Sequence, residues 1–282
     1  MLLFLAFIFK ISRIGYRKAR YVMLPQYIGI CDIQDPGQAR EFANFFDSLC
    51  DMPETAHLKL GIGLMMSYKT LKGLPSRWTN VWVKAVDVAS TFIKHPRVFN
   101  IFHYADYDGE TDLADLLEAV KYGGPHLHAL QLDMIWPSEQ KIANVRKFHP
   151  DLHFVLQVNK AALDQVYNRP DILIEQLKKY VGCVDYVLLD KSMGRGVPMK
   201  VHELRPFARV ISEQLPEMVL VFGGRLGPYT MDAVAPLIEE FPRSSVDMQS
   251  QLRLSGNAMD PICPHRVDKA LVSSVDLFKK VK

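Results

Sequence analysis

Polar and titratable side chains follow several apolar runs in this sequence of 282 residues. In chain order they are Cys31-Asp32, Ser67-Tyr68-Lys69, His103, Asp133, Asn159, Asp190-Lys191, Gly223-Gly224-Arg225 and Asp247-Met248-Gln249-Ser250. A carboxylate, thiol or imidazole at the end of a buried segment can move protons or bind an ion, because burial and neighbouring charges shift its pKa. These residue types therefore indicate a functional site in addition to a structural scaffold.

Gly223 and Gly224 end one of the runs and are followed by Arg225. Glycine lets the backbone approach a ligand closely, and successive backbone N–H groups can face an anion. We interpret the pair as a phosphate site to which Arg225 adds charge. The alternative is a tight turn that leads into a helix near Pro228.

Asp190 is delivered by the apolar run Tyr-Val-Leu-Leu-Asp, beside Lys191 and the loop Gly194-Arg195-Gly196. A carboxyl whose pKa is raised by burial can act as a general acid. The alternative role is to anchor the loop by accepting backbone N–H hydrogen bonds.

Cys31 ends the first run and is followed directly by Asp32. A thiol near positive charge can become a thiolate and act as a base or nucleophile. The alternative is a small core residue.

The elements that position these residues alternate between β-rich apolar runs and segments of helical periodicity. The expected strands are 27–31, 58–66, 98–104, 127–133, 153–159, 186–190, 218–224 and 245–250. The expected helices include 36–49, 112–122, 171–180, 201–214 and 267–282. Continuous apolar strands between helices indicate a parallel sheet covered on both faces. Eight such units predict an α/β fold, a single-domain (β/α)8 TIM barrel over 26–282, whose functional groups sit at the carboxyl ends of the strands. The alternative is a doubly wound open sheet, but no GxGxxG motif follows the first strand.

Composition limits the class of protein further. With 34 basic and 31 acidic residues spread along the chain, a dedicated nucleic-acid binder is not indicated. Positive charge is instead expected locally, around a phosphate-binding mouth, at Lys69, Lys191, Arg195 and Arg225. Four scattered cysteines without a CxxC pair favour free thiols and a cytoplasmic protein.

Residues 1–25 are interpreted as an atypical N-terminal extension, with the functional chain starting near Met23. The apolar stretch 1–9 is shorter than the roughly 20 residues that span a bilayer, so no stable membrane span is expected. It also lacks the order of charges and the cleavage site of a signal peptide. A short membrane-surface anchor is the alternative.

Collinear motifs from about Tyr27 to Lys282 resemble the phosphoribosylanthranilate isomerase family, within the ribulose-phosphate-binding barrels. Cys31, Pro36 and Ala39 keep the spacing of the family's first strand and helix. The other similar segments are Ser67-Tyr68-Lys69 (Ser-x-Arg in the family), Leu130-Gln131-Leu132-Asp133 (Gln-Leu-His-Gly), Leu188-Leu189-Asp190 with Gly194-Arg195-Gly196 (Leu-Asp and Gly-Thr-Gly), Phe222-Gly223-Gly224-Arg225-Leu226 (Ala-Gly-Gly-Leu) and Val246-Asp247-Met248-Gln249-Ser250 (Val-Asp-x-Ser-Ser).

The resemblance implies an Amadori rearrangement of a phosphoribosyl amine, without metal or cofactor, in tryptophan biosynthesis. It implies that Asp190 is the general acid and that Cys31 is the general base. The substrate and phosphate contacts would come from Lys69, Gly194, Gly196, Gly223, Gly224, Asp247 and Ser250, with His103, Asp133 and Arg225 as further candidates. The implied partner is a small phosphorylated sugar, and the implied protein is a monomer or a homodimer.

Four positions depart from the family pattern. Asp32 replaces a glycine and places a negative charge where it raises the pKa of the Cys31 thiol. Lys69 replaces an arginine and lacks the bidentate fork that suits a carboxylate. Asp133-Met134 replaces His-Gly, and Gln251 replaces a glycine after Ser250. These departures indicate a diverged substrate.

Two alternatives stay open. The first is a metal-dependent sugar-phosphate epimerase, with His103, Asp133, Asp190 and Asp247 as ligands; a second histidine is lacking, because His128 comes too early in its strand. The second is a barrel that has lost catalysis and serves as a binding subunit.

Overall fold

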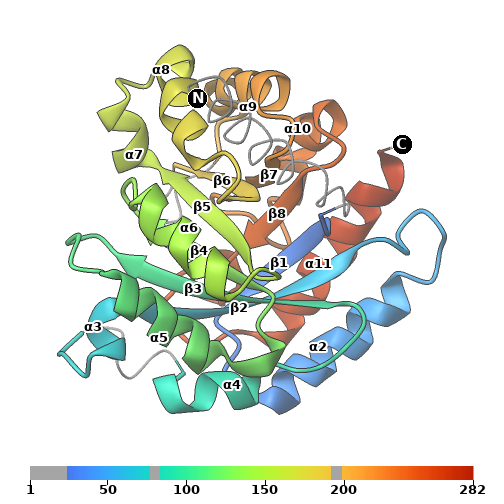
Figure 1. Ribbon diagram of the computed structural model, residues 1–282. Coiled ribbons are helices and arrows are strands. Elements are labelled where there is room, and N and C mark those ends of the chain that lie inside the picture. Colours follow the sequence, from blue (N-terminus) through green and yellow to red (C-terminus); the bar gives the residue numbers. More distant parts are fainter. Residues whose placement is uncertain (1–23, 77–82, 192–198, 282) are drawn as a thin grey trace, which may run out of the picture.

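The computed structural model describes residues 24–76, 83–191 and 199–281. In this part of the chain eight parallel strands close into a barrel in sequence order (Figure 1). The strands are β1 (Tyr27–Cys31), β2 (Lys59–Ser67), β3 (Val98–Asp106), β4 (Ala129–Met134), β5 (His153–Asn159), β6 (Tyr186–Asp190), β7 (Val219–Phe222) and β8 (Ser245–Met248). The predicted (β/α)8 barrel is confirmed.

Helices follow the strands and cover the outside of the barrel (Figure 1). They are α2 (Pro36–Leu49), α3 (Tyr68–Leu71), α4 (Val88–Thr91), α5 (Leu113–Gly123), α6 (Glu139–Phe148), α7 (Lys160–Gln165), α8 (Pro170–Leu177), α9 (Val201–Gln214), α10 (Ala235–Glu240) and α11 (Pro264–Lys280). Short 3-10 turns are η1 (Ala85–Asp87), η2 (Gly124–His126), η3 (Lys178–Tyr180), η4 (Met231–Ala233) and η5 (Ser250–Leu252). The helix α2 begins as the sequence indicates, with Pro36 in its first turn and the Asp35 side chain accepting the Gln38 N–H.

The strand ends differ from the prediction where the backbone turns toward the mouth of the barrel. The strand β7 ends at Phe222, because Gly224 (φ 113°) and Arg225 (φ 54°) leave the extended conformation. The strand β8 ends at Met248, and the chain enters η5 at Ser250. The strand β3 is two residues longer than expected and reaches Asp106. The ends of β1, β5 and β6 agree with the prediction.

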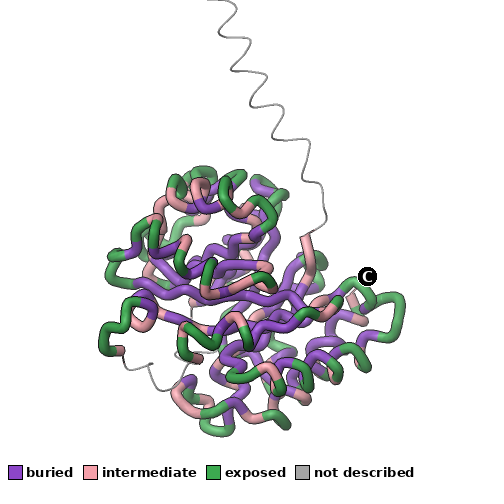
Figure 2. The backbone as a smooth tube through the Cα atoms, turned by 60° about the horizontal axis from the view of Figure 1, so that its bottom comes forward, coloured by how far each residue is buried: buried purple, intermediate pink, exposed green. Residues whose placement is uncertain are grey.

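The core has two parts, and Figure 2 shows the strands buried between the exposed helix faces. Most buried apolar side chains form a large cluster between the strands and the helices. A smaller cluster inside the barrel includes Tyr27, Phe99, Val155 and Tyr186. Leu24 packs against this inner cluster, so the interior near the start of the strands is filled by side chains. A ligand is therefore expected at the opposite, carboxyl ends.

No helix in the described ranges is long and apolar enough to cross a membrane. Most of the predicted N-terminal extension, residues 1–23, lies outside the described residues.

Candidate active site

A cavity of about 1040 Å³ opens at the carboxyl ends of the strands. The predicted site residues that line it are Cys31, Lys69, His103, Asp133, Asp190, Gly223, Gly224, Arg225, Asp247 and Ser250. Gly194, Arg195 and Gly196 lie outside the described residues. The barrel thus brings ten residues that are far apart in the sequence around one space.

Three glutamines and a tyrosine to which the sequence assigned no site role also line this cavity: Tyr107, Gln131, Gln157 and Gln249. Gln131 precedes Asp133 by two residues on β4, so strand alternation places both side chains on the inner face. Applying that period to the strand would have assigned Gln131 to the site. Asn159, in contrast, caps α7 by accepting the Ala162 N–H at 2.9 Å.

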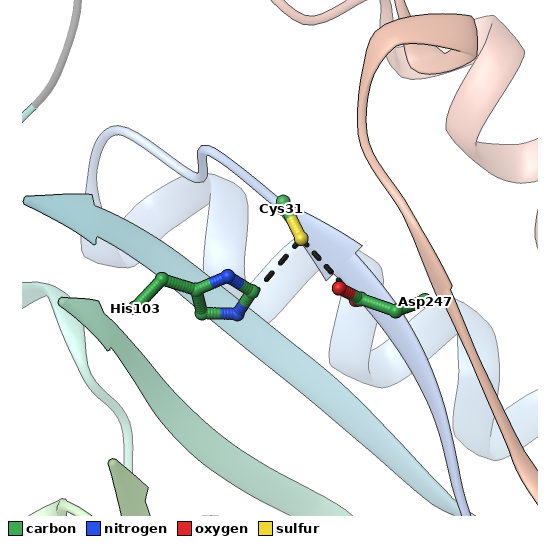
Figure 3. Close-up of side chains that lie close together, drawn as sticks. All are labelled: Cys31, His103 and Asp247. Carbon is green, nitrogen blue, oxygen red and sulfur yellow. Dashed lines mark hydrogen bonds between the residues drawn. The ribbon is translucent and has the colours of Figure 1, made fainter. Parts of the chain in front are cut away.

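The Cys31 thiol lies between two polar partners (Figure 3). It donates a hydrogen bond to Asp247 Oδ1 at 3.2 Å, and its sulfur lies 3.9 Å from His103 Nε2. Gly63 on β2 makes room for this contact: a Cβ there would stand 2.8 Å from His103 Nε2 and 3.1 Å from the sulfur. We call Cys31, His103 and Asp247 the mouth triad.

Burial and neighbouring charges keep the Cys31 thiol of the triad protonated. Burial raises the pKa of Cys31, and the charges of Asp247 and Asp32 raise it further. Asp32 therefore acts in the direction that the sequence predicts, although burial and Asp247 contribute more. Burial also raises the pKa of Asp247 to about 7, while its hydrogen bond with Cys31 opposes that rise. Near neutral pH, Asp247 can therefore accept a proton from the thiol.

A second hydrogen-bonded chain starts at the far side of the His103 ring. Gln131 Nε2 lies 3.0 Å from His103 Nδ1 and 3.0 Å from Asp133 Oδ1. Burial lowers the pKa of His103 to about 3, so its ring is neutral at pH 7. Burial, with the charges of Asp247 and Asp190, raises the pKa of Asp133 to about 8. Asp133 therefore holds a proton at neutral pH and can donate it.

Asp32, the residue after Cys31, forms an ion pair with Arg253, and both side chains are almost completely buried. Arg253 also donates to the carbonyls of Gln249, at 2.6 Å, and Asp260, at 3.2 Å. Asp32 has a φ of 71°, a conformation that favours glycine, the residue found there in the family that the sequence resembles. The pair ties the loop after β8 to the end of β1. Nothing near Arg253 in the sequence points to this role, because its partner Asp32 is 221 residues away in the chain.

The basic residues expected around the mouth are partly neutralised. Lys69 Nζ lies 2.7 Å from Asp108 Oδ2, and Lys191 Nζ lies 3.3 Å from Glu203 Oε2. Arg225 is exposed at the rim of the cavity. Among the described residues that line the cavity, Arg225 therefore supplies the positive charge that is not offset by an ion pair.

In the metal-dependent alternative the ligands would be His103, Asp133, Asp190 and Asp247, and the structure groups two of these with Cys31. In the described part of the chain, the group of potential ligands whose atoms all lie within 4.8 Å of one another is the mouth triad. Cys31, rather than Asp133 or Asp190, joins His103 and Asp247, because the ends of β1 and β8 are adjacent in the barrel. His128 faces a separate cavity of about 740 Å³ at the opposite end, as its early place in the strand predicts.

The buried Asp133 gives a pH-dependent prediction for stability. The folded pKa of about 8 exceeds the unfolded value of 3.8, so above pH 4 the unfolded chain binds fewer protons than the folded one. Stability contributed by this carboxyl is therefore present below pH 4 and is lost as the pH rises to 8. We expect the unfolding free energy of Asp133→Asn, relative to wild type, to increase by a few kcal/mol between pH 4 and pH 8. Each unit of difference between the folded and unfolded pKa contributes at most about 1.4 kcal/mol.

Urea unfolding at both pH values measures this difference. The matched control is Asp164→Asn, because Lys160 lowers the pKa of that exposed carboxyl. Its effect should be small and of opposite sign. If the stability of Asp133→Asn relative to wild type did not change with pH, burial would not raise the pKa of Asp133.

Comparisons with known proteins support the fold. No protein-family model and no curated protein matches the chain. Among solved structures, the chain is similar to phosphoribosyl anthranilate isomerase from Thermus thermophilus, with a TM-score of 0.56 and 14% identity over 91% of this chain and 100% of that chain. It is also similar to the catalytic domain of a hyperthermophilic chitinase from Pyrococcus furiosus, with a TM-score of 0.57 and 12% identity over 92% and 96% of the two chains. At these identities the similarity shows the barrel fold, which enzymes with unrelated chemistry share.

Proposed function

We propose that the chain is an acid–base isomerase that rearranges a phosphoribosyl amine from an aldose to a ketose. The observation that carries the proposal is that the Cys31 thiol from β1 and the Asp190 carboxyl from β6 line one cavity. An acid and a base on different strands can reach opposite sides of one small sugar. The sequence resemblance to the isomerase family gives these two residues the same roles.

Asp190 begins the reaction by giving a proton to the ring oxygen of the sugar. The bond between that oxygen and C1 breaks, and the nitrogen lone pair forms a C1=N bond. This step needs a general acid beside the ring, and Asp190 is buried, with 8% of its surface accessible.

Cys31 then removes the proton from C2. Because burial raises its pKa, the thiol must first pass its own proton to Asp247, which accepts its hydrogen bond at 3.2 Å. Electrons from the C2–H bond move toward C1, and the resulting enolamine tautomerises to the ketose. Asp247 thus stores the proton of the base, in addition to the substrate contact that the sequence resemblance implies.

The phosphate is placed at the β7 and β8 end of the cavity. Gly223, Gly224, Arg225 and Ser250 line this part. Gly223 has a second reason to be glycine, because a Cβ there would stand 3.2 Å from Asp190 Cβ. Arg225 at the rim supplies charge for the phosphate, while the amine portion extends toward Lys69.

Turnover of a phosphoribosyl arylamine by the full chain tests this function. A chelator is included, and formation of the ketose is followed by chromatography. The proposal predicts ketose without added metal. A folded protein that binds the sugar phosphate but gives no ketose would instead favour a binding subunit.

A further inference from the structure

We propose that the mouth triad of Cys31, His103 and Asp247 is a binding site for one zinc ion. The three side chains come from β1, β3 and β8, and their ligand atoms all lie within 4.8 Å of one another. Ligands of a tetrahedral zinc ion with bonds of about 2.0 to 2.3 Å lie roughly 3.3 to 3.6 Å apart. The separations of the Cys31 sulfur from Asp247 Oδ1, 3.2 Å, and from His103 Nε2, 3.9 Å, lie on either side of that range.

The types of ligand select the ion. Thiolate and imidazole favour zinc, whereas calcium and magnesium favour oxygen ligands. Zinc replaces the thiol proton of Cys31, and that proton leaves to solvent. All three side chains line the cavity, so a fourth position on the ion faces the space where a substrate or water would lie. Three protein ligands with one open position are typical of catalytic zinc sites.

The charge around the triad also suits a divalent cation. Asp32 is buried near Asp247, so two carboxyl groups lie close to each other beside the triad. Arg253 is the one buried lysine or arginine among the described residues, and it is paired with Asp32. Among the described residues no lysine or arginine forms an ion pair with Asp247, so a divalent cation would supply positive charge there.

Gln131 is placed to orient the histidine ligand. Its amide contacts His103 Nδ1 at 3.0 Å, and its Oε1 is buried without a hydrogen-bond partner. The two ends of the Gln131 amide have the same shape, so its oxygen and nitrogen can be exchanged. Gln131 Oε1 then accepts the His103 Nδ1–H, and His103 Nε2 is left free to bind the ion. Such a second contact is the usual support of a metal-binding histidine.

Zinc and the proposed isomerase chemistry use the same thiol. A thiolate bound to zinc cannot take a proton from C2, so zinc is expected to inhibit the isomerase. This consequence rests on the proposed function, whereas zinc binding does not.

Calorimetric titration of the chelator-treated full chain with zinc tests the site, and cobalt serves as a spectroscopic probe. We expect one zinc per chain and a thiolate-to-cobalt charge-transfer absorption. Cys31→Ser should remove that absorption and weaken zinc binding more than about 100-fold, beyond the effect of losing a supporting contact. His103→Gln should weaken zinc binding comparably, which keeps the test valid if one variant folds poorly.

The matched control is Cys263→Ser, because this partly exposed cysteine directly precedes α11 and does not line the cavity. It should change neither measurement. Absence of stoichiometric zinc in the folded wild type, or a cobalt absorption that survives in Cys31→Ser, would overturn the proposal. Both measurements are made without substrate, so their failure is distinct from failure of the metal-free turnover.

Discussion

Replacing Cys31 with serine is expected to lower kcat for the proposed isomerisation by roughly 10²- to 10⁴-fold, the usual contribution of a general base. A serine hydroxyl keeps its proton far more strongly than a thiol and cannot pass it to Asp247. The fold should persist, because serine is close to cysteine in size and can still donate to Asp247 Oδ1. Steady-state kinetics on the phosphoribosyl arylamine, with KM reported separately, measure the loss.

Asp190→Asn should reduce kcat to a similar extent, because an amide cannot protonate the ring oxygen. The matched control is again Cys263→Ser, which lies outside the cavity. If Cys31→Ser kept kcat within a few-fold of wild type, Cys31 would not be the base.

Replacing Arg253 with methionine is expected to lower the unfolding free energy by about 3 to 5 kcal/mol, because it leaves the charge of Asp32 buried without its partner. The Asp32 and Arg253 side chains are 2% and 1% exposed, so water cannot take over the role of the guanidinium. The carbonyls of Gln249 and Asp260 would also lose their donor. Chemical denaturation followed by circular dichroism measures the change.

The double variant Asp32→Gly with Arg253→Met should recover most of this loss. It removes both charges, and glycine suits the φ of 71° at position 32. Arg169→Met is the matched control, since it breaks an exposed pair with Asp171 and should leave stability almost unchanged. A double variant as unstable as Arg253→Met alone would show that the pair is not the cause.

The fold was predictable from the sequence because each signal for it is local. Asp35-Pro36 starts a helix, and the run that ends at Asp190 is apolar enough to be a buried strand. The ends of β7 and β8 were less accurate. There, the conformations of Gly224, Arg225 and the η5 turn depend on contacts across the mouth rather than on the apolar pattern.

The candidate site was predictable as a list of strand ends but not as a network. The barrel rule places Cys31, His103 and Asp247 at one mouth, yet it does not show that the thiol contacts the other two. That contact depends on Gly63, a neighbour on the intervening strand. Arg253 carries no local signal at all, since only the closed barrel brings it to Asp32.

The role of Cys31 as the base is tested most directly with a phosphoribosyl arylamine that carries deuterium at C2. Its turnover by the chelator-treated full chain is measured. We predict ketose formation that is slower than with hydrogen at C2, with the deuterium released from that position and the reaction lost in Cys31→Ser. An equal rate with hydrogen and with deuterium at C2, an unchanged rate in Cys31→Ser, or no ketose from folded wild type would contradict the assignment of Cys31 as the base of an isomerase.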